Sequence, residues 1–127
     1  MISKEKRVLI IDDDINCLQL FSIAVKRKGY FVTAVDKRDR ILEESQKSGY
    51  DLLLIDLIIP ELAVSNLIEN FVSANPNSQV ILITGYPEMI SSIEFLTKKY
   101  IYEYLIKPVS PAKLTAIIDE YFKKLVI

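Results

Sequence analysis

Three aspartates in two separate parts of the chain could form a metal-assisted phosphoryl-transfer site. Asp12 and Asp13 follow the apolar segment VLII, and Asp56 follows the apolar segment LLLI. If the fold brings these carboxylates together, their like charges repel and raise at least one pKa unless a cation neutralises them. A divalent cation together with the ammonium group of Lys107 would balance the charge, and an all-oxygen site suits Mg²⁺. A carboxylate beside such a metal can carry a phosphoryl group as an aspartyl-phosphate, to which Thr84 would donate a hydrogen bond.

The composition excludes several other kinds of chemistry. The 127 residues include no histidine and one cysteine, Cys17. Zinc sites with histidine ligands and triads that use histidine are therefore impossible within this chain. Cys17 cannot form an intrachain disulfide, which is typical of a small core side chain in a reducing compartment.

Charge and hydropathy indicate a cytoplasmic protein. The net charge of −1 provides no positive field for nucleic acid or for an anionic membrane. The charged N-terminal residues do not resemble a signal peptide, and the longest apolar stretches, Leu52–Ile55 and Leu57–Pro60, are too short to span a membrane. We therefore expect a cytoplasmic domain that binds neither nucleic acid directly nor a membrane.

Short apolar segments alternate with amphipathic stretches, as in a parallel sheet whose strands are connected by helices. We predict strands at Val8–Ile11, Phe31–Val35, Leu52–Ile55, Gln79–Ile83 and Ile101–Leu105. We predict helices at Ile15–Lys28, Arg38–Lys47, Leu62–Ala74, Met89–Lys99 and Pro111–Lys124. Continuous aliphatic strands indicate that helices cover both faces of the sheet. The whole chain, residues 1–127, is then one domain with five βα units.

Turn and capping residues agree with these boundaries. Gly29 ends the first helix, Gly49 follows the second, and Asn75-Pro76 ends the third. Ser110 is expected to cap the last helix, with Pro111 at its first position. In an open doubly wound sheet the ligand site lies beyond the carboxyl ends of the strands, so the residues that follow the strands are the candidates for chemistry.

Four separated segments together resemble the receiver domain of two-component response regulators. They are VLIIDDD, YDLLLIDLIIP, ILITG and YEYLIKP, and they occur in this order over the full chain. The resemblance implies a flavodoxin-like (βα)₅ fold, a doubly wound sheet of five parallel strands in the order 2-1-3-4-5 with helices on both faces. It also implies a phosphorelay signalling function in which the chain accepts a phosphoryl group and is not a turnover enzyme.

The resemblance implies roles for individual residues around the acidic site. Asp56 would be the phosphoacceptor, taking its phosphoryl group from a phosphohistidine on a partner. Mg²⁺ would bind Asp12, Asp13, Asp56 and the backbone carbonyl of Ile58. The partner that supplies the phosphoryl group would be a sensor histidine kinase or a histidine phosphotransfer protein.

Further residues would bind the phosphoryl group or transmit its arrival. Thr84 and Lys107 would contact the phosphoryl group, and the Lys107-Pro108 peptide bond would be cis. Tyr104 would be the switch aromatic, and its alternation with Tyr100 and Tyr102 suggests that the three rings share one side of the strand. A downstream target would bind the face formed by 89–99, 101–105 and 111–124, or an output domain would follow Ile127.

The first predicted helix offers a surface for the phosphodonor. A helical projection places Cys17, Leu20, Phe21, Ala24 and Lys28 on one side, which we expect to face the sheet. Ile15 and Leu18 then fall elsewhere, beside the acidic site. We expect either that this pair is exposed and docks the donor or that it packs on a neighbouring helix.

Two other functions compete with the receiver hypothesis. A small Mg²⁺-dependent phosphatase of the haloacid-dehalogenase type would use Asp12 and Asp14, followed by a threonine and a lysine. It would leave Asp56 without a role, and no later acidic pair completes its metal site. A pseudo-receiver that acts only by binding is disfavoured by the intact acidic residues, threonine and lysine. Asp14 taken alone is expected to be either a helix cap or a solvated neighbour of the site.

Overall fold

The computed structural model describes residues 5–125, except for the side chains of residues 95–97. Within this range the strands are β1 (Arg7–Ile11), β2 (Phe31–Val35), β3 (Leu52–Asp56), β4 (Gln79–Thr84) and β5 (Ile101–Ile106). The helices are α1 (Ile15–Arg27), α2 (Arg38–Glu44), α3 (Val64–Ala74), α4 (Ser91–Thr97) and α5 (Pro111–Lys124). Two 3₁₀ turns, η1 (Pro87–Met89) and η2 (Lys98–Tyr100), flank α4. The predicted strands and helices are all present, with ends that differ by a few residues.

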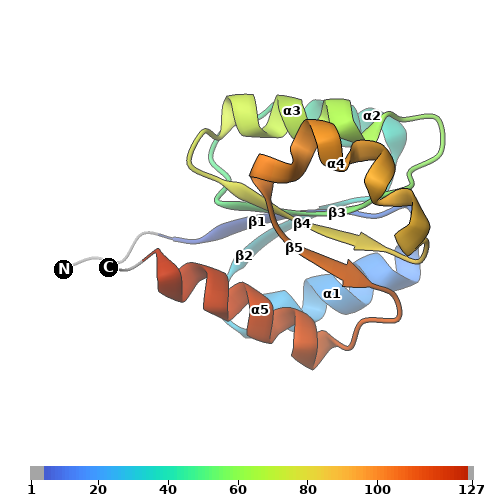
Figure 1. The fold of residues 1–127 in the computed structure, drawn as a ribbon. Coiled ribbons are helices and arrows are strands. Elements are labelled where there is room, and N and C mark those ends of the chain that lie inside the picture. Colours follow the sequence, from blue (N-terminus) through green and yellow to red (C-terminus); the bar gives the residue numbers. More distant parts are fainter. Residues whose placement is uncertain (1–4, 126–127) are drawn as a thin grey trace.

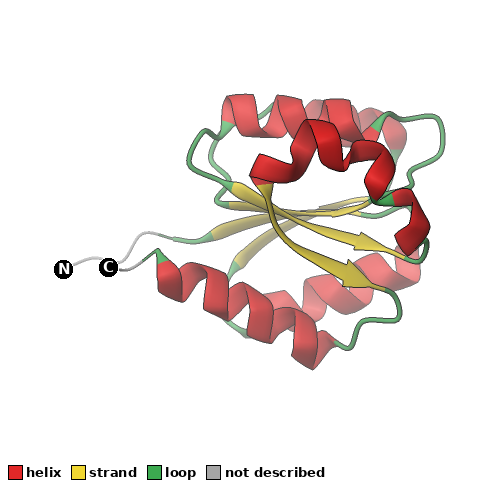
Figure 2. Ribbon diagram, viewed as in Figure 1, coloured by secondary structure: helices red, strands yellow, loops and turns green. Residues whose placement is uncertain are grey.

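The strands form one parallel sheet in the order β2-β1-β3-β4-β5. The predicted fold class and strand order are therefore confirmed. Helices α1 and α5 cover one face of the sheet, and α2, α3 and α4 cover the other (Figures 1 and 2). Because β3 lies between β1 and β4 and is covered on both sides, all five of its residues are buried.

Each face of the sheet has its own hydrophobic core. The alternation of side chains along a strand sends Leu52 and Leu54 toward α1 and α5, and Leu53 and Ile55 toward α2, α3 and α4. Phe71 of α3 is fully buried on the second side. Among the described residues, no helix is long and apolar enough to cross a membrane.

The predicted caps position the helices that surround the acidic site. Asp14 caps α1, because its Oδ1 accepts hydrogen bonds from the backbone N–H groups of Asn16 at 2.9 Å and Cys17 at 3.4 Å. Ser110 caps α5 through a hydrogen bond that its Oγ accepts from Lys113 N at 3.1 Å. Gly29, just beyond α1, has a φ of +97°, a left-handed conformation that glycine adopts without strain.

Three predicted helices are shorter in the structure by two or more residues, and one of them is α2, which ends at Glu44 and not at the predicted Lys47. The predicted helix from Leu62 begins at Val64, because Leu62 instead forms an isolated antiparallel bridge with Ile59 and the intervening Glu61 has a φ of +65°. The predicted helix Met89–Lys99 is α4 alone, with a 3₁₀ turn at each end. Tighter 3₁₀ turns are frequent at helix termini and replace the i→i−4 hydrogen bonds there.

The predicted orientation of α1 is wrong. Leu18 is 4% exposed and packs in the core between the sheet and α1, whereas Leu20 is 50% exposed. The buried positions are Leu18, Phe21, Ser22 and Val25, which follow the i, i+3, i+4, i+7 spacing of one helical stripe. Because α1 has apolar residues around most of its circumference, the helical projection chose a stripe that is rotated from the buried one.

The predicted common side of the three tyrosines near β5 is also wrong. Tyr100 and Tyr104 pack on the face that α4 covers, whereas Tyr102 packs on the face that α5 covers. The pairing of β4 with β5 shifts by one residue, since Val80 is opposite Ile101 but Ile81 is opposite Glu103. This extra residue in β5 reverses the side on which Tyr102 projects.

Candidate functional site

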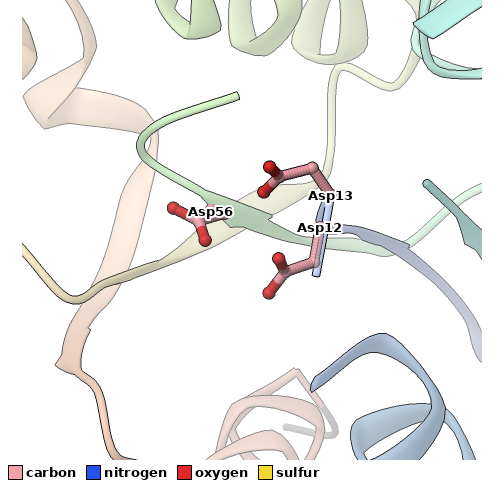
Figure 3. Close-up of side chains that lie close together, drawn as sticks. All are labelled: Asp12, Asp13 and Asp56. Atoms are coloured by element: carbon pink, nitrogen blue, oxygen red, sulfur yellow. The ribbon is translucent and has the colours of Figure 1, made fainter. Parts of the chain in front are cut away.

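The carboxyl ends of β1 and β3 bring three aspartates together at one edge of the sheet. Asp12 and Asp13 follow β1, and Asp56 is the last residue of β3, the strand beside it. One carboxylate oxygen from each residue lies within 4.8 Å of the other two. Figure 3 shows the side chains of Asp12 and Asp13 extending from the end of β1 toward the side on which Asp56 lies.

The side chain of Lys107 contacts two of these three carboxylates. Its Nζ donates to Asp56 Oδ2 at 2.7 Å and to Asp12 Oδ2 at 3.0 Å. Lys107 follows β5, but hydrogen bonding of its backbone N–H to Thr84 O at 2.8 Å holds it against the end of β4. The side chains of Asp12 and Asp56 are only 3% and 10% exposed, so solvent screens these ion pairs weakly.

The remaining carboxylate oxygens accept hydrogen bonds from the backbone. Asp12 Oδ1 accepts from Asp14 N at 2.9 Å, and Asp56 Oδ1 accepts from Ile58 N at 2.9 Å. These bonds fix both carboxylates before any ligand binds. Each acid therefore presents a defined orientation toward the space that it shares with Asp13.

Burial and charge move the pKa values at this site in specific directions. Burial raises the pKa of Asp12 above its ordinary value, and the charge of Asp56 adds to this, although Asp14 N and Lys107 oppose the shift. Burial alone would lower the pKa of Lys107, but Asp56 and Asp12 outweigh burial and raise it. Lys107 is thus held as a cation, while the negative charges of Asp12 and Asp56 still repel each other.

The donor set of this cluster fits a hard divalent cation. All three side chains that meet here offer carboxylate oxygens, with no histidine or thiol ligand among them. Mg²⁺ binds oxygen ligands and commonly uses one or two carboxylates while it keeps several waters. A divalent cation would also relieve the repulsion that Lys107 balances only in part.

Thr84 and Pro108 lie at the same edge of the sheet. Thr84 is fully buried at the end of β4, and its Oγ1 accepts a hydrogen bond from Tyr86 N at 2.9 Å. The proton of the Thr84 hydroxyl is not used in that bond. The Lys107-Pro108 peptide bond is cis, as the family resemblance implied.

Tyr104 lies in β5, on the face of the sheet that α4 covers. Its hydroxyl group is buried and has no hydrogen-bond partner among the described residues. Burial raises the pKa of Tyr104, and the charge of Glu94 on α4 raises it further. The ring thus places an unsatisfied hydroxyl under α4.

The two residues expected to dock a donor do not form a pair. Ile15 is 46% exposed at the start of α1, beside Asp14, and remains available to a partner. Leu18 is buried beneath the helix and cannot contribute to a docking surface without unfolding α1.

Two side chains near the site were not singled out from the sequence. Tyr86, two residues beyond β4, is 56% exposed, and Ile106, the last residue of the neighbouring strand β5, is 54% exposed. The available signal was an apolar side chain at the carboxyl end of a strand, where solvated residues are the usual expectation.

Comparison with known proteins agrees with the fold and the acidic cluster. The family model for the response regulator receiver domain matches residues 8–119. The chain therefore belongs to the receiver domain family of two-component response regulators.

Individual relatives support the same conclusion. The transcriptional regulatory protein ZraR of Klebsiella oxytoca is 27% identical over 120 residues, which cover 94% of this chain and 27% of that protein. The response regulator receiver protein CpdR of Brucella abortus is 30% identical over 81 residues, covering 64% of this chain and 68% of that protein. A CheY-like receiver domain protein from Methanospirillum hungatei JF-1 has a TM-score of 0.82 with 26% identity, covering 95% of this chain and 96% of that one. The chain spans about a quarter to a third of several larger transcriptional regulators that it matches.

The competing functions are not favoured. A phosphatase of the dehalogenase type would need Asp14 as an acid at the reaction centre, but its Oδ1 caps α1. These backbone bonds lower the pKa of Asp14, as expected for a helix cap. A pseudo-receiver is not favoured because Asp12, Asp13 and Asp56 remain grouped.

Proposed function

We propose that Asp56 accepts a phosphoryl group from a phosphohistidine on a partner protein. An oxygen of Asp56 forms a bond to phosphorus as the bond from phosphorus to the imidazole nitrogen breaks, and the electron pair of that bond stays on the nitrogen. The observation that carries this proposal is the contact of Lys107 Nζ with both Asp56 and Asp12 beside Asp13.

The surrounding residues have roles that follow from their chemistry. Asp12, Asp13, Asp56 and the backbone carbonyl of Ile58 would hold Mg²⁺, which supplies positive charge to the transferring oxygens. Lys107 would neutralise a second oxygen, and the hydroxyl proton of Thr84 would reach a third. In this role the chain receives one phosphoryl group and passes it on or loses it, without cycling on an external substrate, so it would not be a turnover enzyme.

Partners follow from the same reaction. Because these 127 residues contain no histidine, the phosphohistidine would lie outside them, on a sensor histidine kinase or a histidine phosphotransfer protein. Ile15 lies near the site and would contact that donor. Tyr104 and the α4–β5–α5 face would transmit the change to a downstream target or to an output domain beyond Ile127. In this proposal residues 1–127 act as a single cytoplasmic receiver domain.

Labelling with a small phosphodonor tests the assignment of Asp56. The protein is incubated with radiolabelled acetyl phosphate and Mg²⁺, and acid-labile label is measured on wild type, Asp56→Asn and Asp36→Asn. Asp36 follows the edge strand β2 and serves as a matched control at the same edge of the sheet. We expect label on wild type and Asp36→Asn and none on Asp56→Asn. Label of undiminished stoichiometry on Asp56→Asn would refute the assignment.

A further inference from the structure

The loop between β3 and α3 contains a turn with an unfavourable backbone conformation. The N–H of Leu62 donates to Ile59 O at 3.1 Å and closes a four-residue turn with Pro60 and Glu61 at its centre. Glu61 has a φ of +65°, which the third position of a type II turn requires and which glycine or asparagine usually supplies. A glutamate in this conformation is strained, so another interaction has to offset the cost of the turn.

An ion pair with α2 provides that interaction. Arg38 Nη1 donates to Glu61 Oε2 at 2.7 Å. Arg38 is the first residue of α2, and Ile41, one turn further along the helix, is fully buried, so the arginine extends from an anchored element. The two side chains of the pair are 59% and 71% exposed, and such exposed pairs contribute little to the stability of a whole domain. We therefore expect the effect of this pair in the conformation of the turn itself.

The turn adjoins the backbone carbonyl that is proposed to bind Mg²⁺. This carbonyl belongs to the peptide group between Ile58 and Ile59, and Ile59 is the first residue of the turn. On the other side, the N–H of Ile58 donates to Asp56 Oδ1 at 2.9 Å. The orientation of the carbonyl thus depends on the acceptor on one side and on the turn on the other. When only a fraction of the molecules has the binding conformation, the apparent affinity for the ligand falls by that fraction.

We propose that Arg38, acting through Glu61, is a positioning residue for Mg²⁺, because it holds the turn that keeps the carbonyl of Ile58 available to the ion. This inference rests on the proposed function, from which it takes the carbonyl of Ile58 as a ligand. It adds a residue outside the acidic cluster that sets the affinity of the site for Mg²⁺. Neither Arg38 nor Glu61 contacts the ion or the reacting atoms.

Titration with Mg²⁺ alone tests the role of Arg38. The dissociation constant is measured from the backbone amide NMR signals, which also show that each variant is folded. Arg38→Ala leaves the strained turn unsupported, so we expect its dissociation constant to rise roughly threefold. A purely electrostatic role would have the opposite sign, because removal of a positive charge near the site strengthens the binding of a cation. Arg38→Lys keeps an ion pair with Glu61 and should bind Mg²⁺ nearly as wild type does.

Two substitutions of Glu61 separate backbone conformation from charge. Glu61→Ala and Glu61→Gly remove the same negative charge and the same ion pair, but only glycine adopts the positive φ without strain. We expect Glu61→Ala to bind Mg²⁺ about threefold more weakly than wild type, and Glu61→Gly to stay close to wild type. Lys124→Ala breaks a pair with Glu120 on α5 whose side chains are similarly exposed, 62% and 57%, and should leave the affinity unchanged.

The outcomes distinguish this inference from the proposed function. If wild type does not bind Mg²⁺, or takes up no label that depends on Asp56, the proposed function and this inference both fail. If wild type binds Mg²⁺ and is labelled, but Arg38→Ala binds Mg²⁺ as tightly as wild type or more tightly, only the positioning role is overturned. Equal affinities of Glu61→Ala and Glu61→Gly also overturn it, because charge alone would then account for the change.

Discussion

The two sides of β5 differ in whether the hydroxyl groups of their tyrosines have hydrogen-bond partners. On the side of α5, four rings form a continuous row across the sheet, Tyr30, Phe122, Tyr121 and Tyr102, with successive centroids 5.0, 5.0 and 5.1 Å apart. Each tyrosine hydroxyl in this aromatic row donates a hydrogen bond, to Asp119, to Asp51 O or to Glu120. On the side of α4, the buried hydroxyl of Tyr104 has no partner among the described residues.

The helices on these two sides also differ, and α5 is again the one with more stabilising interactions. Helix α5 has 14 residues, a side-chain cap at Ser110 and four buried side chains, at Leu114, Ile118, Tyr121 and Phe122. Helix α4 has seven residues, no side-chain hydrogen bond at its N-cap and a 3₁₀ turn at each end. We call residues 87–100, which include η1, α4 and η2, together with Tyr104 the α4 corner. The comparison teaches that the face proposed for output combines a firmly packed helix with a corner that is weakly held.

Removal of a ring from the aromatic row should produce the largest effect. Phe122 is 3% exposed and contacts the rings of both Tyr30 and Tyr121. Phe122→Ala should lower the free energy of unfolding by about 3–5 kcal/mol, because it removes buried area and leaves a cavity. Ile90→Ala at the α4 corner, where Ile90 is only partly buried, should cost about 1 kcal/mol. Urea denaturation of both variants checks this, and equal losses would contradict the comparison.

The free energy of local opening should differ between α4 and α5, by somewhat less than the expected effect of Phe122→Ala. Amide hydrogens of α4 should exchange with an opening free energy about 2 kcal/mol below those of α5, because a seven-residue helix without a side-chain hydrogen bond at its N-cap opens without global unfolding. Native-state hydrogen exchange followed by mass spectrometry measures both in one sample. Protection in α4 equal to that in α5 would show that the corner is not weakly held.

The strands and the acidic site could be predicted from sequence for a clear physical reason. Parallel strands covered on both faces are continuous apolar segments, and β3 is one of these. A carboxylate such as Asp56 at the end of such a strand has no structural explanation and so marks a site. The ends of neighbouring parallel strands meet at one edge, which brings Asp12 and Asp13 to it.

The errors arose where the local pattern is ambiguous. Helix α1 has exposed apolar residues, such as Leu20 and Ile23, as well as the buried stripe, so the sequence alone does not define its inner face. Strand β5 contains one residue beyond strict alternation, which moved Tyr102 to the opposite side. Such a shift in register has no signal in the hydrophobic period of the strand.

High pH should weaken the aromatic row through Tyr121. Burial raises the pKa of Tyr121 from its ordinary value of 10.0 to about 12, with Asp51 and Tyr102 as the nearby acidic groups that add to the shift. For an acid whose pKa is higher in the folded state, the stabilisation is complete below the unfolded pKa and is lost as pH rises toward the folded pKa. Stability should therefore fall by on the order of 2 kcal/mol between about pH 10 and about pH 12.

Urea denaturation at several pH values in this range measures the loss. Tyr121→Phe should show a shallower decline, because its ring cannot ionise. A decline of the same slope in Tyr121→Phe would assign the loss to other groups, among them Tyr30, whose pKa burial also raises.

A pair of matched hydroxyl deletions gives the smallest effect and compares the two sides most directly. Tyr121→Phe removes a hydrogen bond to Asp51 O that is 3.0 Å long, and should cost about 1 kcal/mol. Tyr104→Phe removes a buried hydroxyl that has no partner among the described residues, and should be neutral or stabilise by up to about 1 kcal/mol. The substitutions are chemically identical, so any difference in sign comes from the surroundings of the hydroxyl group. Urea denaturation near neutral pH measures both variants. If Tyr104→Phe lowers the free energy of unfolding as much as Tyr121→Phe does, the hydroxyl group of Tyr104 has a hydrogen-bond partner in solution. The unfavourable burial that distinguishes the α4 corner would then not exist.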